Sequence, residues 1–344
     1  MNNSLLLKYH NTEIFVYSNN DFFVDIISKL YVNLVVEPHG IIAFGYKHSI
    51  CICVDESNVM FTIDNYEKIY GNKIGWIKQF DQMIHKTVMN DNQNMLFLHA
   101  SAVKADDTIF AFCGESGSGK TTCTLHFCLN SKFHFIADDF LPISEGLVYS
   151  FAMNIHVKKE SLHFFDSTSR MSACEEYRCG IRETSYYFPI KELGINSVEN
   201  ISKEKIVIVF VNYNKINDFV RKVSHIDGFR SLILNTYNNN SISNLICALN
   251  YVFAFYKVHY TSFATLDYSI KQIRESLNTL SQHGYQIIFS THSSQMITSD
   301  LAKDTILIRK NNQQGTHCRL TISEAVNQVI VQRPAQATHL FSLT

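Results

Sequence analysis

The sequence predicts a fold that combines helices and strands, of the α/β or α+β class, and two observations support that prediction. The first is an apolar, β-prone run at 108–113, a glycine-rich segment at 114–121, and a stretch at 120–129 without Gly or Pro that suits a short helix. The second is the run at 206–211, which is apolar at every position. A strand of that kind is typical of the buried centre of a sheet.

The first part of the chain follows a different pattern. Short β-like runs alternate there with polar breaks of a few residues, which favours antiparallel pairing. Helix-like stretches lie near 21–30 and 74–88. We therefore expect an N-terminal β-rich region, residues 1–95, mainly antiparallel and packed on the rest of the fold. Its predicted strands are Glu13–Tyr17, Gly40–Tyr46, Ile50–Val54 and Met60–Ile63.

The remaining chain divides into a predicted core, residues 96–280, and a C-terminal extension, residues 281–344. In the core we expect a further strand at 133–137 and helices at 243–255 and 268–282. The sequence contains neither an internal repeat nor an extended low-complexity linker, so it does not mark these boundaries precisely.

Composition narrows the functional classes. The 344 residues are 46% hydrophobic, which is enough for a substantial core. A formal net charge of −1, with 18% charged residues, gives no reason to expect a nucleic-acid or membrane partner. No apolar run approaches the ~20 residues of a membrane span, and Met1–Ser4 opens without a signal-like profile. The nine scattered cysteines lack zinc spacing and are typical of reduced, mostly buried thiols, so we expect a cytoplasmic protein.

The segment 114–121 fits the phosphate-loop pattern G-x-x-x-x-G-K-[ST], in the strand–loop–helix context that this pattern requires. Its glycines permit backbone angles at which successive N–H groups surround a polyphosphate. Lys120 would reach the β- and γ-phosphates, and the Thr121 hydroxyl would bind Mg²⁺. We therefore predict a nucleotide site, with an ordinary glycine-rich turn as the alternative. Its residues are Gly114, Glu115, Ser116, Gly117, Ser118, Gly119, Lys120, Thr121 and Thr122.

Asp138 and Asp139 follow the predicted strand 133–137. If that strand neighbours the strand of the loop, both carboxylates come to the phosphate side of the sheet, because ligands gather at the carboxyl ends of strands. One carboxylate would hold Mg²⁺, and the other would accept a proton from an attacking hydroxyl. Successive strand residues point to opposite faces, so both reach the site only if the chain bends there. The alternative is a solvated strand end.

His99 lies in the apolar run 96–103, which we predict as the strand just before the strand of the loop. A lone His on an apolar strand is more often a core residue with satisfied hydrogen bonds. Taken in order, however, the segments Leu98–Val103, Phe112–Thr122 and Phe135–Phe140 resemble the kinase domain of the HPr serine kinase/phosphorylase family. They are more closely similar to its divergent HPr-kinase-like members, and a looser similarity covers about residues 10–280.

This resemblance implies a mixed-sheet P-loop kinase core, related to the nucleotide-binding domain of phosphoenolpyruvate carboxykinase. It also implies binding of ATP and Mg²⁺ and transfer of a phosphoryl group to a serine hydroxyl. By motif, His99 would lie beside the carboxylate pair and would act with Lys120 in catalysis. Asp138 would be the base, and Asp139 would join Thr121 as a metal ligand.

We expect a peptide or a small protein as the acceptor, with a small-molecule hydroxyl as the alternative, because the related carboxykinase fold handles a small acid. The family's Glu-Arg-Gly-Leu signature is not reproduced at 150–165 or 175–183, so the resemblance does not extend to phosphorylase activity. Arg178 and Arg182 would either approach the transferring phosphate or be solvated loop residues. The true HPr enzymes resemble closed homo-oligomers, which leaves a homo-oligomer open here.

The segment Gly284–Ile297 resembles the strand-plus-histidine switch of ABC-type and overcoming-lysogenization-type ATPases, with His292 in a Thr-His-Ser. The sequence holds neither an upstream strand ending in Asp-Glu nor a Leu-Ser-Gly-Gly-like signature. Two alternatives to the kinase therefore stand beside it. One is a P-loop ATPase switch or defence module that uses His292, and the other is a protein that senses nucleotide without turnover.

Overall fold

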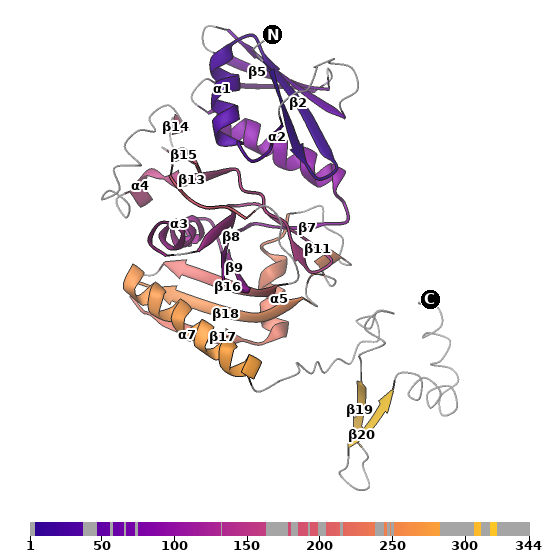
Figure 1. Ribbon diagram of the computed structural model, residues 1–344, viewed down its shortest axis with the longest axis vertical. Helices are drawn as coiled ribbons and strands as arrows, with labels where there is room; N and C mark the ends of the chain where they lie inside the picture. The colour runs from indigo at the N-terminus through magenta and orange to yellow at the C-terminus, as the bar shows by residue number, and fades with distance from the viewer. Residues whose placement is uncertain are drawn as a thin grey trace. The chain divides into compact units, whose positions relative to one another are not determined.

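The chain forms a mixed α/β protein, seen in a computed structural model (Figure 1). Its contacts divide it into two compact units, residues 1–277 and 278–344. The structure describes residues 4–36, 47–55, 58–64, 67–72, 75–131, 133–162, 178–179, 185–191, 193–198, 204–213, 216–237, 244–245, 248, 251–282, 306–310 and 317–321.

The N-terminal sheet is mainly antiparallel, with the strand order β3-β1-β2-β4-β5-β6. Only the β2–β4 pair is parallel among the pairings of this sheet that the structure describes. Three of the four strand runs expected here are present, and the fourth, 40–46, lies outside the described residues. The strands are β1 (Ser4–Tyr9), β2 (Thr12–Ser18), β3 (Val35–Val36), β4 (His48–Val54), β5 (Asn58–Ile63) and β6 (Glu67–Asn72).

Two helices accompany this sheet, α1 (Asp21–Leu30) and α2 (Trp76–Asp91). The Asn20 side chain starts α1 by accepting a hydrogen bond of 3.0 Å from the Phe22 N–H. Buried apolar residues then recur at helical spacing, so one face of α1 packs into the core. Both helices lie where the sequence pattern predicts them.

The central sheet has the order β10-β8-β9-β16-β18-β17. β9, β16 and β18 are parallel neighbours, whereas β8, β10 and β17 add antiparallel pairings, so the sheet is mixed. The all-apolar run at 206–211 occupies β16, in the middle of the sheet, as expected. The strands are β8 (Ala100–Ala105), β9 (Thr108–Cys113), β10 (His134–Ala137), β16 (Lys205–Tyr213), β17 (Phe219–Val223) and β18 (Val252–Tyr260).

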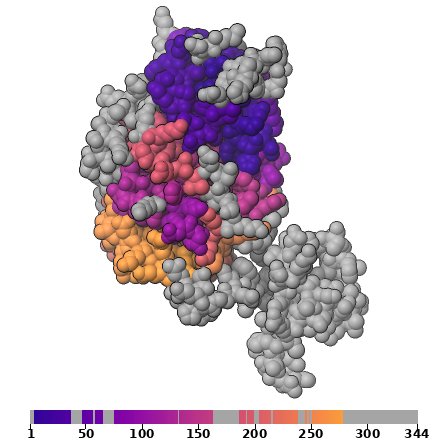
Figure 2. Space-filling model, viewed as in Figure 1, coloured from indigo at the N-terminus to yellow at the C-terminus, as the bar shows by residue number. Residues whose placement is uncertain are grey.

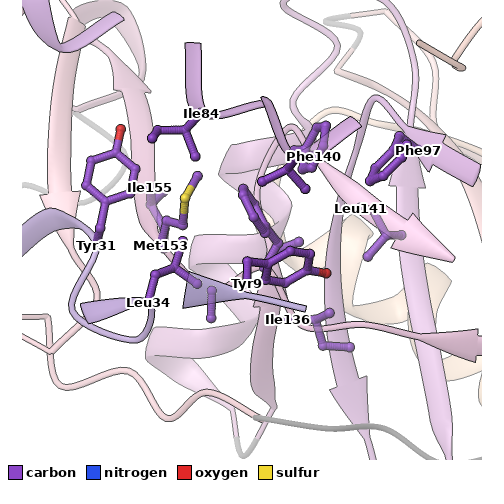
Figure 3. Packing of buried hydrophobic residues seen from close by; sticks show 14 of the residues in the cluster. Tyr9, Tyr31, Leu34, Ile84, Phe97, Ile136, Phe140, Leu141, Met153 and Ile155 are labelled. Atoms are coloured by element: carbon purple, nitrogen blue, oxygen red, sulfur yellow. The ribbon is translucent and has the colours of Figure 1, made fainter. Parts of the chain in front are cut away.

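Helices cover both faces of this sheet. Phe110 and Phe112 of β9 pack with residues of α3 (Lys120–Asn130) and α7 (Phe263–Gln282). Ile109 and Ala111 point to the other face, into a cluster that includes Leu232 of α5 (His225–Ile233). That second cluster also contains residues of the N-terminal sheet, and Figure 3 shows Tyr9, Ile84, Phe97, Phe140 and Ile155 packed within it.

Small sheets complete the first unit, with the orders β12-β11-β7 and β13-β15-β14. In the second unit, β19 and β20 pair as an antiparallel hairpin. The remaining elements are β7 (Leu96–Leu98), β11 (Leu141–Ser144), β12 (Leu147–Val148), β13 (Asn154–Lys158), α4 (Lys159–Leu162), β14 (Arg178–Cys179), β15 (Ser185–Pro189), β19 (Ile306–Lys310) and β20 (His317–Thr321).

Three sequence-based boundaries differ from the structure. The helix expected at 243–255 is wrong at its end, because β18 begins at Val252, where a run rich in aromatic residues favours a strand. Residues 244, 245 and 248 are helical. α7 begins at Phe263, before the expected 268, because Ser262 and Thr265 exchange hydrogen bonds between their side chains and backbone N–H groups as a helix cap. The run 96–103 forms two strands, β7 and β8, in different sheets.

Five cysteines are free thiols: Cys51, Cys53, Cys113, Cys123 and Cys128. Cys113 and Cys123 are buried, as expected, but Cys51 and Cys53 are partly exposed on β4, with their Sγ atoms 3.4 Å apart. Among the helices that the structure describes, none combines the length and apolar character that a membrane crossing requires.

Candidate functional site

The predicted phosphate loop, residues 114–121, connects β9 to α3, and three of its glycines have positive φ angles. Gly114, Gly117 and Gly119 have φ angles of 151°, 84° and 98°, a region that L-residues with side chains rarely adopt. At Gly119 space is also limiting, because a Cβ atom there would lie 2.2 Å from the hydroxyl of Tyr260. Glycine is therefore required at these positions by backbone conformation, and at Gly119 by space as well.

Lys120 is folded back into the loop. Its Nζ donates hydrogen bonds to the carbonyl oxygens of Gly114, at 2.9 Å, and Glu115, at 3.2 Å, and the residue is buried. The hydroxyl of Ser118 is buried and finds no hydrogen-bond partner among the described residues. Lys158 approaches from β13, with its Nζ 3.5 Å from the Ser116 hydroxyl. Two ammonium groups thus contact a loop that is suited to an anion.

The Asp pair reaches the loop by a different route from the one predicted. β10 is not the neighbour of β9, because β8 lies between them. β8 is antiparallel to both strands, so β9 and β10 run in the same direction and end at the same edge. The start of β8 lies at that edge too. The loop, the carboxylates after β10 and His99 before β8 therefore come together, and we call this place the phosphate edge.

Asp138 is buried and holds several donors at the phosphate edge. Ser101 donates its hydroxyl hydrogen to Oδ1 of Asp138. Thr121 lies with its hydroxyl 3.0 Å and 3.2 Å from the two carboxylate oxygens, and the His156 N–H donates to Oδ2 at 3.2 Å. The Asp that follows β10 is therefore in direct contact with the last residue of the loop motif.

The chain bends at Asp139, as the sequence analysis expected if both carboxylates were to reach the site. Its φ of 60° is left-handed, so its carboxylate leaves the strand direction and meets His99, with Nε2 3.4 Å from Oδ1. The side chains of Asp139 and His99 are 37% and 38% exposed, so both are accessible from solvent. His99 itself is not within a strand, which corrects the prediction. It lies at the junction where the chain leaves β7 and enters β8.

The two carboxyl groups have divergent pKa values. Burial, with the adjacent charge of Asp139, raises the pKa of Asp138 to about 7. Burial by itself would raise the pKa of Asp139 as well, but the hydrogen bond and charge of His99, with the charge of Lys120, lower it to about 2. Two neighbouring carboxyl groups with separated pKa values are the arrangement that lets one hold charge while the other exchanges a proton.

The phosphate edge is held in place by residues that the sequence analysis did not identify. Asn235, just after α5, accepts a hydrogen bond of 3.0 Å from the Gly114 N–H, and its carbonyl accepts one of 2.7 Å from His99. The Tyr237 hydroxyl donates to the carbonyl oxygen of Asp139 at 2.8 Å. Ser101 could have been noticed, because it follows His99 by two positions. Asn235 and Tyr237 carry no sequence signal, because they lie far along the chain.

The side chains at the phosphate edge suit a magnesium–nucleotide complex. Mg²⁺ prefers oxygen ligands and is commonly held by one or two carboxylates together with substrate phosphates. The Thr121 hydroxyl and the carboxylates of Asp138 and Asp139 are ligands of that kind. Within the described part of the chain, no three His, Cys, Asp or Glu side chains gather as a complete metal site.

Other candidates are not brought to this edge by the described structure. Arg178 is in β14, and Arg182 and His292 lie outside the described residues.

No protein-family model matches this chain. It is similar to Old nuclease of Escherichia phage P2, with 40% identity over 76 residues, which are 22% of this chain. The chain covers only 13% of that protein's length. It is also similar to the structure of the Hpr(Ser) kinase/phosphatase from Coxiella burnetii, with 9% identity, 53% of this chain and 98% of that chain covered, and a TM-score of 0.23. A TM-score this low supports no argument about fold or function.

Proposed function

We propose that the chain is a kinase of the HPr-kinase-like type, which transfers the γ-phosphoryl group of ATP to a serine hydroxyl. One observation carries the proposal. The phosphate loop, the Asp138–Asp139 pair and His99 meet at one sheet edge, where the Thr121 hydroxyl contacts the Asp138 carboxylate at 3.0 Å. A glycine-rich turn or a solvated strand end would not need this convergence.

In the proposed reaction the acceptor hydroxyl oxygen attacks the γ-phosphorus and forms the new P–O bond. The bond from the γ-phosphorus to the oxygen bridging it to the β-phosphate breaks, and ADP leaves. A carboxylate takes the proton of the hydroxyl. Catalysis of this kind is mostly positioning and charge neutralisation. Lys120 and the loop N–H groups would stabilise the charge on the phosphoryl oxygens, and Mg²⁺, when bound, would supply further charge neutralisation.

We assign the proton transfer to Asp138 and metal binding to Asp139 with Thr121. The raised pKa of Asp138 supports this, because a base works best when its pKa is near the operating pH. The 3.0 Å contact between Thr121 and Asp138 favours the opposite assignment, with Asp138 at the metal. Titration of Mg²⁺ into Asp138→Asn and Asp139→Asn, each with ADP present, separates the two, because the metal ligand is the residue whose loss weakens Mg²⁺ binding more.

For the acceptor we propose a peptide or small protein in the cytoplasm, with no membrane or nucleic-acid partner. His99 and Asp139 are partly exposed, so an acceptor side chain can reach the phosphate edge from solvent. The proposal leaves open a homo-oligomer, as in the true HPr enzymes.

A second candidate is an ATPase switch or defence-type module. The observation that favours it is the 40% identity over 76 residues to Old nuclease, together with the Thr-His-Ser at His292. The third candidate is nucleotide sensing without turnover. No specific observation favours it, and it is one possible outcome of the test below.

The test is incubation of the protein with γ-labelled ATP and Mg²⁺, with and without a pool of serine-containing peptides. Wild type, Asp138→Asn and His292→Ala are compared for ADP release and for label on peptide. The kinase proposal expects label on peptide from wild type and His292→Ala, and none from Asp138→Asn. ADP release without labelled peptide, lost in His292→Ala alone, would support the ATPase instead. ATP binding with neither product would leave the nucleotide sensor.

A further inference from the structure

A hollow opens beside the phosphate loop in the first unit. It holds about 350 Å³ of empty space, with the open solvent at its mouth included. On the face shown in Figure 2, the orange surface of the segment that leads into α7 lies next to a purple and magenta surface. The hollow is lined by Gly117, Gly119, Thr122, Ser161, Tyr213, Tyr260, Ser262 and Phe263.

The position of the hollow relates it to the nucleotide. Gly117, Gly119 and Thr122 belong to the loop and the first turn of α3, so they form both the phosphate site and one wall of the hollow. A nucleoside attached to phosphates in the loop is therefore close enough to enter the hollow. The other walls come from the ends of β16 and β18 and the start of α7.

Aromatic rings provide the apolar surface. Phe263 is stacked on His126, with ring centroids 4.1 Å apart and an interplanar angle of 11°, so its plane is fixed before any ligand binds. Tyr213 is half-buried, and its ring lies 5.5 Å from that of Tyr260. Tyr260 is almost fully buried beneath Gly119 and forms the floor. Planar rings held in this way suit a planar base.

The rim of the hollow offers little that could distinguish one purine from another. Three backbone N–H groups there are already hydrogen-bonded within the protein: Tyr213 to the Ser118 carbonyl at 2.9 Å, Thr261 to Asp218 at 2.6 Å, and Ser262 to the Thr265 hydroxyl at 3.2 Å.

The polar groups on the side chains lining the hollow are hydroxyls, without a carboxylate or amide among them. A hydroxyl can either donate or accept a hydrogen bond. A hydroxyl can therefore hydrogen-bond equally well to adenine and to guanine, although the edges of these two bases carry opposite patterns of donors and acceptors.

From these contacts we propose that the hollow binds the base of the nucleotide by stacking on Phe263 and Tyr213 and does not read its edge, so that adenine and guanine nucleotides bind alike. The inference rests on the proposed nucleotide site and deepens it, because it names the residues and the class of base. Stacking is tolerant of base identity because every base presents a π-face.

The test is calorimetric titration of the full-length protein with ATP, GTP and inorganic tripolyphosphate, each with Mg²⁺. Tripolyphosphate carries the phosphates without the base, so it reports on the loop alone. Wild type should bind ATP and GTP within about threefold of each other, and should bind tripolyphosphate about 5- to 150-fold more weakly, the range that base–aromatic stacking contributes.

Variants at Phe263 then locate the contact. Phe263→Leu keeps an apolar side chain and removes the aromatic face, and Phe263→Ala removes both. Both should weaken ATP and GTP equally and leave tripolyphosphate unchanged. Tyr268→Ala, on the exposed side of the same helix at 62% exposure, is the matched control and should change nothing. Thermal unfolding of each variant verifies that it is folded.

The outcomes distinguish a failure of the proposed base site from a failure of the proposed function. Equal affinities for ATP and tripolyphosphate in wild type, with no effect of Phe263→Leu, would overturn the base site alone. A preference above about thirtyfold for ATP over GTP would overturn the tolerance of base identity, because a difference of that size requires hydrogen bonds to the base edge. Failure of wild type to bind tripolyphosphate and both nucleotides would overturn the proposed function itself.

Discussion

Two clusters of carboxylates and histidine in this protein have opposite character. One joins β4, the end of β5 and the end of α2 in the N-terminal region, and we call it the N-terminal clamp. The other is at the phosphate edge. The residues are His48, Asp64 and Asp91 in the clamp, and His99, Asp138 and Asp139 at the phosphate edge.

In the N-terminal clamp each carboxylate has a cation within contact distance. His48 lies 3.0 Å from Asp64 through Nδ1 and 3.1 Å from Asp91 through Nε2, and Lys47 lies 2.7 Å from Asp91. Burial alone would lower the pKa of His48, but the hydrogen bonds to Asp64 and Asp91 raise it. Burial alone would raise the pKa of Asp91, and the hydrogen bonds from Lys47 and His48 lower it. The charges are matched inside the protein.

At the phosphate edge Asp139 is paired with His99, whereas no basic side chain among the described residues forms an ion pair with Asp138. The two carboxyl groups are adjacent in the chain, and Nε2 of His99 is 3.4 Å from Oδ1 of Asp139. Asp138 receives only hydroxyl and backbone donors, and its pKa rises to about 7. A carboxylate that is paired with a cation, such as Asp91, contributes to the fold, whereas a buried carboxylate without one, such as Asp138, is suited to a ligand that brings its own positive charge. Four predictions test this contrast.

The largest expected effect is on phosphoryl transfer by Asp138→Asn. Loss of a general base should lower the transfer rate about 10²- to 10⁴-fold, while ATP still binds. Single-turnover transfer of label to the peptide pool measures the rate, and equilibrium titration measures binding. Full activity in this variant would remove Asp138 as the base.

The next largest effect is on nucleotide binding by Lys120→Ala. Removal of a charge-assisted contact to the phosphates should weaken ATP binding about 10- to 150-fold. Lys158→Ala is the matched control, since this lysine reaches the loop only at Ser116, with a distance of 3.5 Å, and we expect a smaller loss. Calorimetric titration with ATP and Mg²⁺ compares the two. Unchanged affinity in Lys120→Ala would contradict the phosphate-loop interpretation.

The N-terminal clamp should respond in stability and not in activity. Asp91→Asn removes hydrogen bonds to Lys47 and His48 at a side chain that is 7% exposed, and should lower the free energy of unfolding by about 1–3 kcal/mol. Asp25→Asn removes an exposed pair with Lys29 and should cost less than about 1 kcal/mol. Urea denaturation gives both values. Similar losses in the two variants would mean that the clamp contributes no more than an ordinary surface pair.

The smallest effect concerns pH. The pKa of His48 is raised in the folded protein, so its stabilising contribution is fully present below the unfolded pKa of about 6.5 and is lost as pH rises through the higher folded value. The groups that face His48 are Asp64 and Asp91, with Lys47 on the far side of Asp91. The stability lost in His48→Gln relative to wild type should therefore be larger at pH 6 than at pH 9. A difference that does not change with pH would exclude a charged His48.

The sequence predicted the local parts of the phosphate edge and not its long-range supports. The loop, the strand before it and α3 follow from a contiguous pattern, and α1 follows from its cap and its apolar spacing. The position of β8 between β9 and β10 could not be read from the chain, because pairing depends on contacts between distant segments. For the same reason, the sequence did not identify Asn235 and Tyr237. These residues follow α5 in the chain and contact the phosphate edge only in the folded protein.

The most direct test of the contrast compares Asp138→Asn with Asp91→Asn in one experiment, measuring phosphoryl transfer and thermal unfolding for each. We expect Asp91→Asn to keep transfer and to unfold at a lower temperature than wild type, and Asp138→Asn to lose transfer and stay folded with ATP bound. Transfer retained in Asp138→Asn, or lost in Asp91→Asn at a temperature where it is folded, would contradict the assignment of function to the phosphate edge.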